Sequence, residues 1–269
     1  MRSGNPSSNF HGIFWSYGMR CLRASIVFLT RIPVGLGPKG FPPFHKVVAW
    51  FPITGALIGC AVGFAYFGLS QLLPSALSAA IAIAFGVAVT GAFHLDGLAD
   101  SADAFAGGST VERRLEILKD SRLGTYGTSA LALALLIEMA ALGSLAPFDG
   151  LIGLISAHAG GRSAALFTMV FARQAAQEGL GADYISAVTW PRGLAGVLAG
   201  VTILIVLNGP KGLLLLTFAL PAIVIISAWS YRSIGGLVGD SLGAIAQLAQ
   251  MSLLIGSVAL TDGSCDCSW

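Results

Sequence analysis

Long apolar runs joined by short polar connections make up most of the chain after about residue 47. Each run is close to the roughly 20 residues that a helix needs to cross a bilayer. The candidate spans cover about residues 48–70, 76–93, 128–146, 151–170, 194–208, 211–229 and 242–260. The fifth run is short and NGPKG separates it from the sixth, so this pair forms either two spans or one re-entrant hairpin. The pattern predicts an all-α fold, a polytopic transmembrane helical bundle of about seven spans.

The segment before the first run has a different pattern. Arg20 and Arg23 interrupt the apolar residues of 13–30 at helical spacing, which favours an amphipathic helix lying in the membrane interface over a span. The prolines and glycines of FLTRIPVGLGPKGFPPF exclude a regular helix there. The leader MRSGNPSSNFHG lacks the features of a secretory signal, so no signal peptide is expected. The chain therefore divides into an N-terminal leader, interfacial helix and basic loop, a transmembrane domain that carries the long loop 94–127, and a C-terminal tail, at residues 1–46, 47–260 and 261–269.

Lysine and arginine fall on alternate connections. They gather in the N-terminal segment and in the connections 94–127, 171–193 and 230–241, whereas the opposite side receives little beyond Lys211. Basic loops stay in the cytoplasm, so these connections are predicted to be cytoplasmic. The N-terminus is then inside and the C-terminus outside.

Composition agrees with a membrane protein. Hydrophobic residues make up 55% of the chain, charged residues 10%, and the mean hydropathy is +0.80, which excludes an ordinary soluble domain. A net charge of +2 does not indicate nucleic-acid binding. Cys21 and Cys60 are interpreted as small apolar residues, and no function is assigned to Cys265 and Cys267.

The long inner loop begins with an acidic stretch, FHLDGLADSADAFAGG. Asp96, Asp100 and Asp103 stand at relative positions 0, 4 and 7, which at roughly 100° per residue confines the carboxylates to about 60° of one helix face. Like charges on consecutive turns repel one another unless a cation lies among them. A hard divalent cation is therefore expected. The alternative is a structural role, with Asp96 or Asp100 capping a helix and His94 a boundary residue.

The same loop ends in KDSRLGTYG, residues 119–127. Lys119, Asp120, Ser121 and Arg122 precede a glycine-bounded turn, where backbone amides, hydroxyls and cations can bind phosphate oxygens. Phosphoryl or nucleotidyl transfer requires two kinds of group side by side: carboxylates that hold a metal and cations that hold phosphate. The alternative is a basic membrane anchor followed by a helix cap. The charged residues between the two stretches are interpreted as a solvated face: Glu112, Arg113, Arg114 and Glu116.

Two later residues belong to the same inner surface. Arg162 lies within an apolar run, where an unpaired charge is costly, so it is expected to face the bundle interior or an aqueous cleft and to pair with an anion. Asp240 lies among the glycines of GGLVGDSLGA. It is interpreted as a metal ligand, a ribose contact or a helix N-cap.

FHLDGLADSADAFAGG, LEILKDSRLGTYG and GGLVGDSLGA, preceded by FLTRIPV and FPITGALIG, resemble the cobalamin synthase (adenosylcobinamide-GDP ribazoletransferase) family. The likeness covers most of the chain in the same order, and the first two motifs together are highly specific. The resemblance implies a multi-pass enzyme of the bacterial inner membrane with cytoplasmic active-site loops. Such enzymes join adenosylcobinamide-GDP to α-ribazole or its 5′-phosphate, release GMP and require Mg²⁺. The expected partners are these two substrates and membrane lipid, and the sequence leaves open whether the chain forms a homo-oligomer.

The resemblance also implies site residues. The family's acidic motif matches Asp96, Asp100 and Asp103, which with Asp240 of the C-terminal GD segment would hold the metal against the GDP pyrophosphate. The expected catalytic residues are Asp96, Asp100, Asp103, Lys119, Asp120 and Arg122. The expected substrate-binding residues are Ser121, Gly124, Thr125, Tyr126, Gly127, Arg162 and Asp240. One departure is visible, because Gln247 and Gln250 stand where the family is expected to carry glutamates.

Two other classes are weighed against this hypothesis. A CDP-alcohol phosphotransferase also uses spaced aspartates with Mg²⁺ at a membrane face, but its pattern, D-x-x-D-G followed by A-R and G-x-x-x-D-x-x-x-D, is not reproduced here. A secondary transporter would explain Arg162 and the glycine-rich helices. It predicts polar groups near the bilayer midplane, however, whereas the polar groups of this chain gather in loops on one side.

Overall fold

The structure is a computed structural model that describes residues 6–171, 175 and 188–261. Within these residues the chain is helical and forms no β-strand, so the predicted all-α class is confirmed. The helices are α1 (Pro6–Leu29), α2 (Phe44–Val47), α3 (Phe51–Leu69), α4 (Ser75–Thr90), α5 (Phe93–Gly107), α6 (Val111–Ile117), α7 (Thr125–Gly143), α8 (Pro147–Phe171), α10 (Trp190–Asn208), α11 (Lys211–Ile234) and α12 (Gly239–Leu260), with a 3₁₀ turn at Val48–Trp50. The segment between α1 and α2 is irregular, as its prolines and glycines predict.

Every predicted apolar run corresponds to a helix. By length and composition, five helical segments can cross a membrane, or six if the bent pair α4 and α5 counts as one span. Both α10 and α11 qualify separately, which favours two spans over a re-entrant hairpin. A polytopic helical membrane protein is confirmed, while the number seven stays a prediction because α4 is only 16 residues long and α8 is not among the helices apolar enough to cross a membrane.

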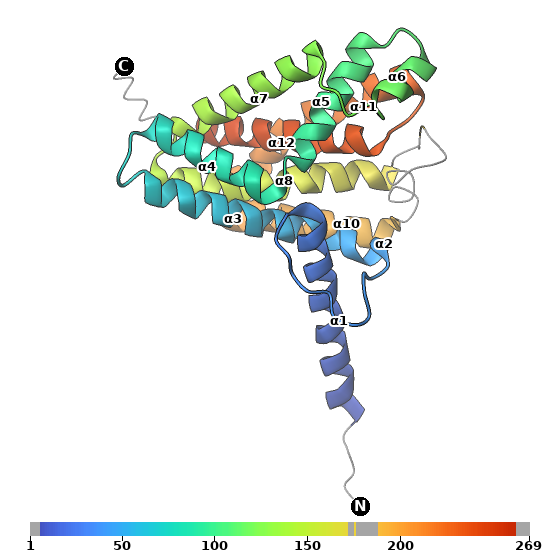
Figure 1. Ribbon diagram of the computed structural model, residues 1–269. Helices are drawn as coiled ribbons and strands as arrows, with labels where there is room; N and C mark the ends of the chain where they lie inside the picture. The colour runs from blue at the N-terminus through green and yellow to red at the C-terminus, as the bar shows by residue number, and fades with distance from the viewer. Residues whose placement is uncertain (1–5, 172–174, 176–187, 262–269) are drawn as a thin grey trace, which may run out of the picture.

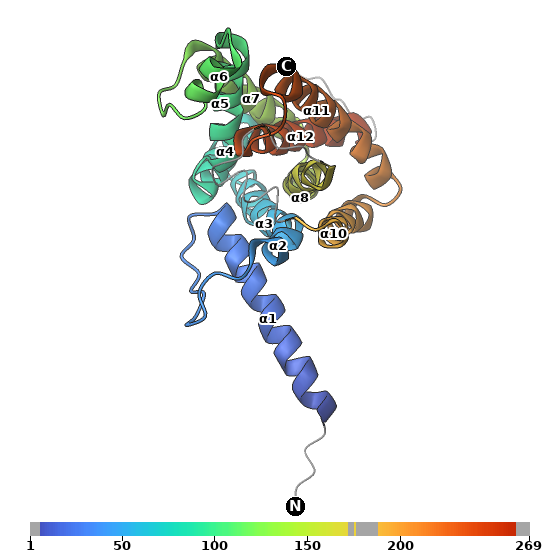
Figure 2. The same cartoon turned by 90° about the vertical axis from the view of Figure 1, so that its right-hand side faces the viewer.

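The central helix of the bundle is α8. It contacts α3, α10, α11 and α12, which surround it in Figure 2. Gly55, Gly59 and Gly63 repeat along one face of α3 and lie directly against the α8 backbone, because small residues let two helices approach closely. A helix enclosed by others does not need an apolar surface toward lipid. This explains how α8 accommodates Arg162 and His158.

A sharp bend sets the direction of α5. It leaves α4 at 90° through Gly91 and Ala92, whose φ angles are +64° and +60°. A left-handed alanine is uncommon and is kept only where its surroundings fix it. Here the Arg31 N–H donates to the Val89 carbonyl oxygen at 2.8 Å and the Ala92 N–H donates to the Val87 oxygen at 3.1 Å. The bend carries α5 across one end of the bundle (Figure 1).

The connections alternate between the two ends of the bundle. In Figure 1, α6 and the start of α7, the end of α11 and the start of α12 lie at the right-hand end, and the turns after α3, α7 and α10 lie at the left-hand end. The polar connections 94–127 and 230–241 therefore share one end, as predicted. In Figures 1 and 2, α1 runs across the direction of the bundle helices, the orientation of a helix that lies in an interface.

Candidate active site

The predicted acidic helix is α5, and it carries all three aspartates. Asp96 is exposed, Asp100 is half-buried and Asp103 is buried, with 8% of its surface exposed. The three residues therefore descend from the surface into the protein along one helix. His94, expected to be a boundary residue, is buried at the start of the same helix.

The first turn of α12 brings a fourth carboxylate, Asp240, to α5. A Cβ on Gly97 would lie 2.8 Å from the Asp240 carbonyl oxygen, so only glycine allows this approach. The charges of Asp96, Asp103 and Asp240 all act on the Asp100 carboxylate, and Asp96 also acts on Asp240. The N-cap of α12 is Val238, so Asp240 lies inside the first turn and does not cap the helix. The carboxylates predicted from separate motifs are thus gathered at one place.

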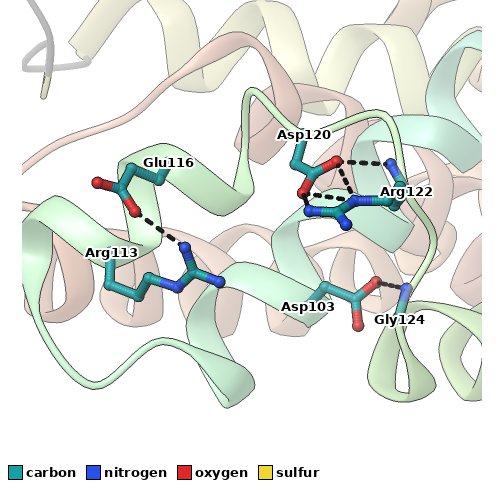
Figure 3. Close-up of polar contacts among 6 residues, drawn as sticks. All are labelled: Asp103, Arg113, Glu116, Asp120, Arg122 and Gly124. Carbon is teal, nitrogen blue, oxygen red and sulfur yellow. Dashed lines mark hydrogen bonds and ion pairs between the residues drawn. The ribbon is translucent and has the colours of Figure 1, made fainter.

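Asp103 has contacts that set it apart from the other aspartates. Its two carboxylate oxygens accept hydrogen bonds from the backbone N–H groups of Gly124, at 2.7 Å, and Gly127, at 2.9 Å; Figure 3 shows the first. These amides stand at the N-terminus of α7, where a negative charge is stabilised. A Cβ on either glycine would collide with the carboxylate. Asp103 therefore joins the acidic helix to the glycine turn, and both expected substrate-binding amides are already paired.

Asp120 and Arg122 pair with each other in the loop before α7 (Figure 3). The Arg122 guanidinium donates from Nη2 to Asp120 at 2.6 Å and from Nε at 3.0 Å. These hydrogen bonds lower the pKa of Asp120 to about 2 and raise the pKa of Arg122, so both groups are charged at neutral pH. The other expected side chains of this stretch are exposed: Lys119, Ser121, Thr125 and Tyr126.

The short helix α6 shows one correction. Arg113 and Glu116 form an exposed ion pair at 2.9 Å, as expected of a solvated face (Figure 3). Arg114 does not belong to that face. Its guanidinium donates to the carbonyl oxygens of Gly108 and Ser233, both at 2.9 Å, and so ties α6 to the ends of α5 and α11. The prediction for Arg114 was wrong because carbonyls left unpaired near helix ends attract cationic side chains.

A polar network lies inside the bundle, away from the loops. Arg162 is 3% exposed and faces the interior, as predicted. Its Nη1 contacts Gln250 Oε1 and, at 3.0 Å, His158 Nδ1, and no carboxylate pairs with it directly among the described residues. Glu138 of α7 accepts hydrogen bonds from the side-chain amides of Gln247 and Gln250, each at 3.0 Å. The expected anion thus reaches Arg162 only through a neutral amide.

Sequence reasoning did not identify Glu138. The sequence does contain a signal for Glu138, because it is the single carboxylate within an apolar run. A carboxylate inside a membrane is costly and so indicates a function or a partner. Gln247 and Gln250, which depart from the family's expected glutamates, both donate to this carboxylate. In this chain α7 therefore supplies an acidic group next to α12.

The gathered carboxylates suit one kind of metal site. In the described part of the chain no three Asp, Glu, His or Cys side chains form a complete metal-binding group. Mg²⁺ in proteins is usually held by one or two carboxylates, and waters and substrate phosphates complete its octahedron. Asp96, Asp100 and Asp240 offer such hard oxygen ligands. Asp103 fits less well, because both of its oxygens already accept amide hydrogen bonds.

The fold and site define a polytopic helical membrane protein whose acidic and basic groups meet at one end of the bundle. The family model described as cobalamin-5-phosphate synthase matches residues 21–258. The chain belongs to this family, as its motifs predicted, and is an enzyme of it.

Similar proteins carry one name, adenosylcobinamide-GDP ribazoletransferase. The protein of Azorhizobium caulinodans is 38% identical over 250 residues, which cover 87% of this chain and 93% of the relative. The protein of Halorubrum lacusprofundi is 36% identical, covering 88% of this chain and 95% of the relative. The protein of Ralstonia pickettii is 32% identical, covering 89% and 95%. No solved structure matches the chain.

Proposed function

We propose that this protein joins adenosylcobinamide-GDP to α-ribazole or α-ribazole 5′-phosphate in a Mg²⁺-dependent reaction. The products are adenosylcobalamin, or its 5′-phosphate, and GMP. The proposal rests on one observation: Asp96, Asp100 and Asp240 lie close enough at one end of the bundle to act on one another's charge. Asp103, on the same helix as Asp96 and Asp100, binds the KDSRLGTYG turn through the Gly124 N–H. The names of the relatives, which align over most of the chain, supply the substrates.

The acidic and basic groups divide the work of phosphoryl transfer. A ribose hydroxyl of the ribazole attacks the phosphorus on the cobinamide side, and the bond from that phosphorus to GMP breaks. Asp96, Asp100 and Asp240 would hold Mg²⁺, which neutralises the charge of the pyrophosphate and of the departing GMP. Lys119 and Arg122 share that charge as cations beside the phosphates.

The remaining residues position this machinery. Asp103 keeps the start of α7 against α5, so the loop that ends there stays beside the carboxylates. The Asp120–Arg122 pair is exposed and therefore exchanges readily for a phosphate. The hydroxyls of Ser121, Thr125 and Tyr126 are exposed to donate to the substrate.

The proposal includes the side of the membrane. Arg113 and Arg114 belong to α6, and Lys119 and Arg122 to the loop that follows it. Figure 1 shows α6 at the end of the bundle to which α5 leads. Basic connections face the cytoplasm, so this end of the bundle lies on the cytoplasmic side of a bacterial inner membrane.

One assay tests the function. Purified protein in detergent is incubated with adenosylcobinamide-GDP, α-ribazole and Mg²⁺, and GMP and adenosylcobalamin are separated by chromatography. We expect both products in equal amounts, none after addition of EDTA, and recovery when Mg²⁺ is restored. Substrate binding without GMP release would instead favour a transporter. Release of CMP from a CDP-linked lipid, with no GMP from the cobinamide substrate, would favour a CDP-alcohol phosphotransferase.

A further inference from the structure

Four phenylalanine rings line a cavity beside the acidic site. They come from the end of α1 (Phe28) and the starts of α2, α3 and α5 (Phe44, Phe51 and Phe93). The rings of Phe28 and Phe51 are stacked, with centroids 5.4 Å apart and planes at 11°. Phe28 also meets Phe44 and Phe93 edge to face, at 5.2 and 5.3 Å. These segments, far apart in the sequence, thus build one aromatic wall.

The cavity has room for a small ring system. Its volume is about 70 Å³, and one water needs about 10–15 Å³ by the same measure. Apart from backbone, its lining is apolar except for His94 and Arg162 among the described residues. An apolar cavity with few polar groups is typical of a small-molecule site. The four phenylalanine rings of this lining suit a flat apolar ring.

One of the two polar side chains has an unused donor. Arg162 is 3% exposed, and its Nε–H has no hydrogen-bond partner in the part of the chain that the structure describes. A buried donor without an acceptor is costly and rare, so it indicates a missing partner. Arg162 lines this cavity and also the interior cavity that Glu138 and Gln250 line, and an acceptor atom on a ligand in the first would supply the missing partner.

The cavity adjoins the proposed reaction site. His94 precedes Asp96 by two residues on α5, and Gly239 and Gly243 of the cavity lining flank Asp240 on α12. The same two helices therefore carry the cavity wall and the carboxylates.

We propose that this cavity binds the aromatic base of the ribazole substrate, with the Arg162 Nε–H donating to the ring nitrogen that does not carry the ribose. The inference rests on the proposed function and adds to it the site that recognises the base. An azole base is a flat apolar ring with one acceptor nitrogen, and the cavity offers phenylalanine rings and one buried donor. Stacking on aromatic side chains provides affinity, and the hydrogen bond provides selectivity.

The Phe93→Leu variant tests the aromatic wall. Phe93 is 45% exposed, so its ring can be removed without opening the core, and leucine keeps an apolar side chain there. The matched control is Phe148→Leu, at a position that is 62% exposed at the start of α8, at the opposite end of the bundle. In the GMP-release assay, Phe93→Leu should raise the KM for α-ribazole about 10-fold, with kcat and the KM for adenosylcobinamide-GDP nearly unchanged. The control should match the wild type. An equal rise in both KM values, or a fall in kcat alone, would overturn the proposal.

A substrate analogue tests the hydrogen bond without changing the protein. In an indole riboside, a carbon replaces the acceptor nitrogen of the base. The wild type should show a KM for this analogue at least about 10-fold above that for α-ribazole, because the buried donor is left unpaired. Equal KM values would overturn the assignment of Arg162.

Calorimetric binding of α-ribazole separates this inference from the proposed function. If the wild type releases no GMP, the proposed function fails, and the binding measurement still decides the cavity. Binding about 10-fold weaker in Phe93→Leu than in Phe148→Leu supports the base site. Equal binding by the two variants, no binding, or displacement of α-ribazole by added phospholipid alone overturns it.

Discussion

The acidic site at the end of the bundle and the polar network inside it use similar residues in opposite ways. In the network, Glu138 accepts hydrogen bonds from the side-chain amides of Gln247 and Gln250. The Gln250 Oε1 in turn accepts from Arg162. At the acidic site, by contrast, Asp96, Asp100 and Asp240 repel one another. Charges that the protein compensates internally stabilise the fold, whereas like charges without an internal partner are the basis of the proposed Mg²⁺ site.

Asp103 stands between the two cases. It belongs to the acidic helix by sequence, but its carboxylate is compensated by the amides of Gly124 and Gly127. Spacing along a helix therefore does not by itself assign a role. The contacts of each carboxylate separate the proposed metal ligands, Asp96, Asp100 and Asp240, from the residue that positions the loop.

The largest predicted effect is at the uncompensated carboxylates. Asp96→Ala or Asp100→Ala should lower GMP release at least about 100-fold, because the charge that stabilises the transition state is lost. Both variants should still insert in the membrane and elute as the wild type does from a sizing column. Asp149→Ala, which removes an acidic residue at the opposite end of the bundle, should keep full activity. Full activity of either site variant at limiting Mg²⁺ would refute the metal hypothesis.

A smaller effect, on stability, is predicted for the compensated network. Glu138→Ala leaves the amides of Gln247 and Gln250 without their acceptor, and each unpaired buried group costs about 1–3 kcal/mol. The free energy of unfolding should fall accordingly, seen as a lower unfolding temperature in detergent. Glu138→Gln keeps an acceptor oxygen and should lose less. An unfolding temperature that is the same in Glu138→Ala and the wild type would show that the network does not stabilise the fold.

Local patterns in the sequence predicted what depends on neighbours along the chain. Hydropathy gave the position of every long bundle helix, and the spacing of Asp96, Asp100 and Asp103 predicted one acidic helix. The motif resemblance added Asp240, which packing of α12 against Gly97 brings to that helix.

What the sequence could not show depends on distant parts of the chain. The contacts of Asp103 are backbone amides 21 and 24 residues away, and Glu138 meets glutamines 109 and 112 residues away. Such contacts follow from helix packing, and no periodicity encodes them. The left-handed Ala92 that turns α5 across the bundle is equally invisible, since alanine ordinarily continues a helix.

Binding of Mn²⁺, which takes the same octahedral oxygen sites as Mg²⁺, reports whether the carboxylates of α5 and α12 hold a divalent metal. Electron paramagnetic resonance can follow it in purified protein with adenosylcobinamide-GDP present. We expect the wild type and Asp103→Asn to bind Mn²⁺ alike, and Asp100→Asn to bind it at least about 10-fold more weakly. Equal Mn²⁺ binding by the wild type and Asp100→Asn would contradict the claim that these carboxylates hold the metal.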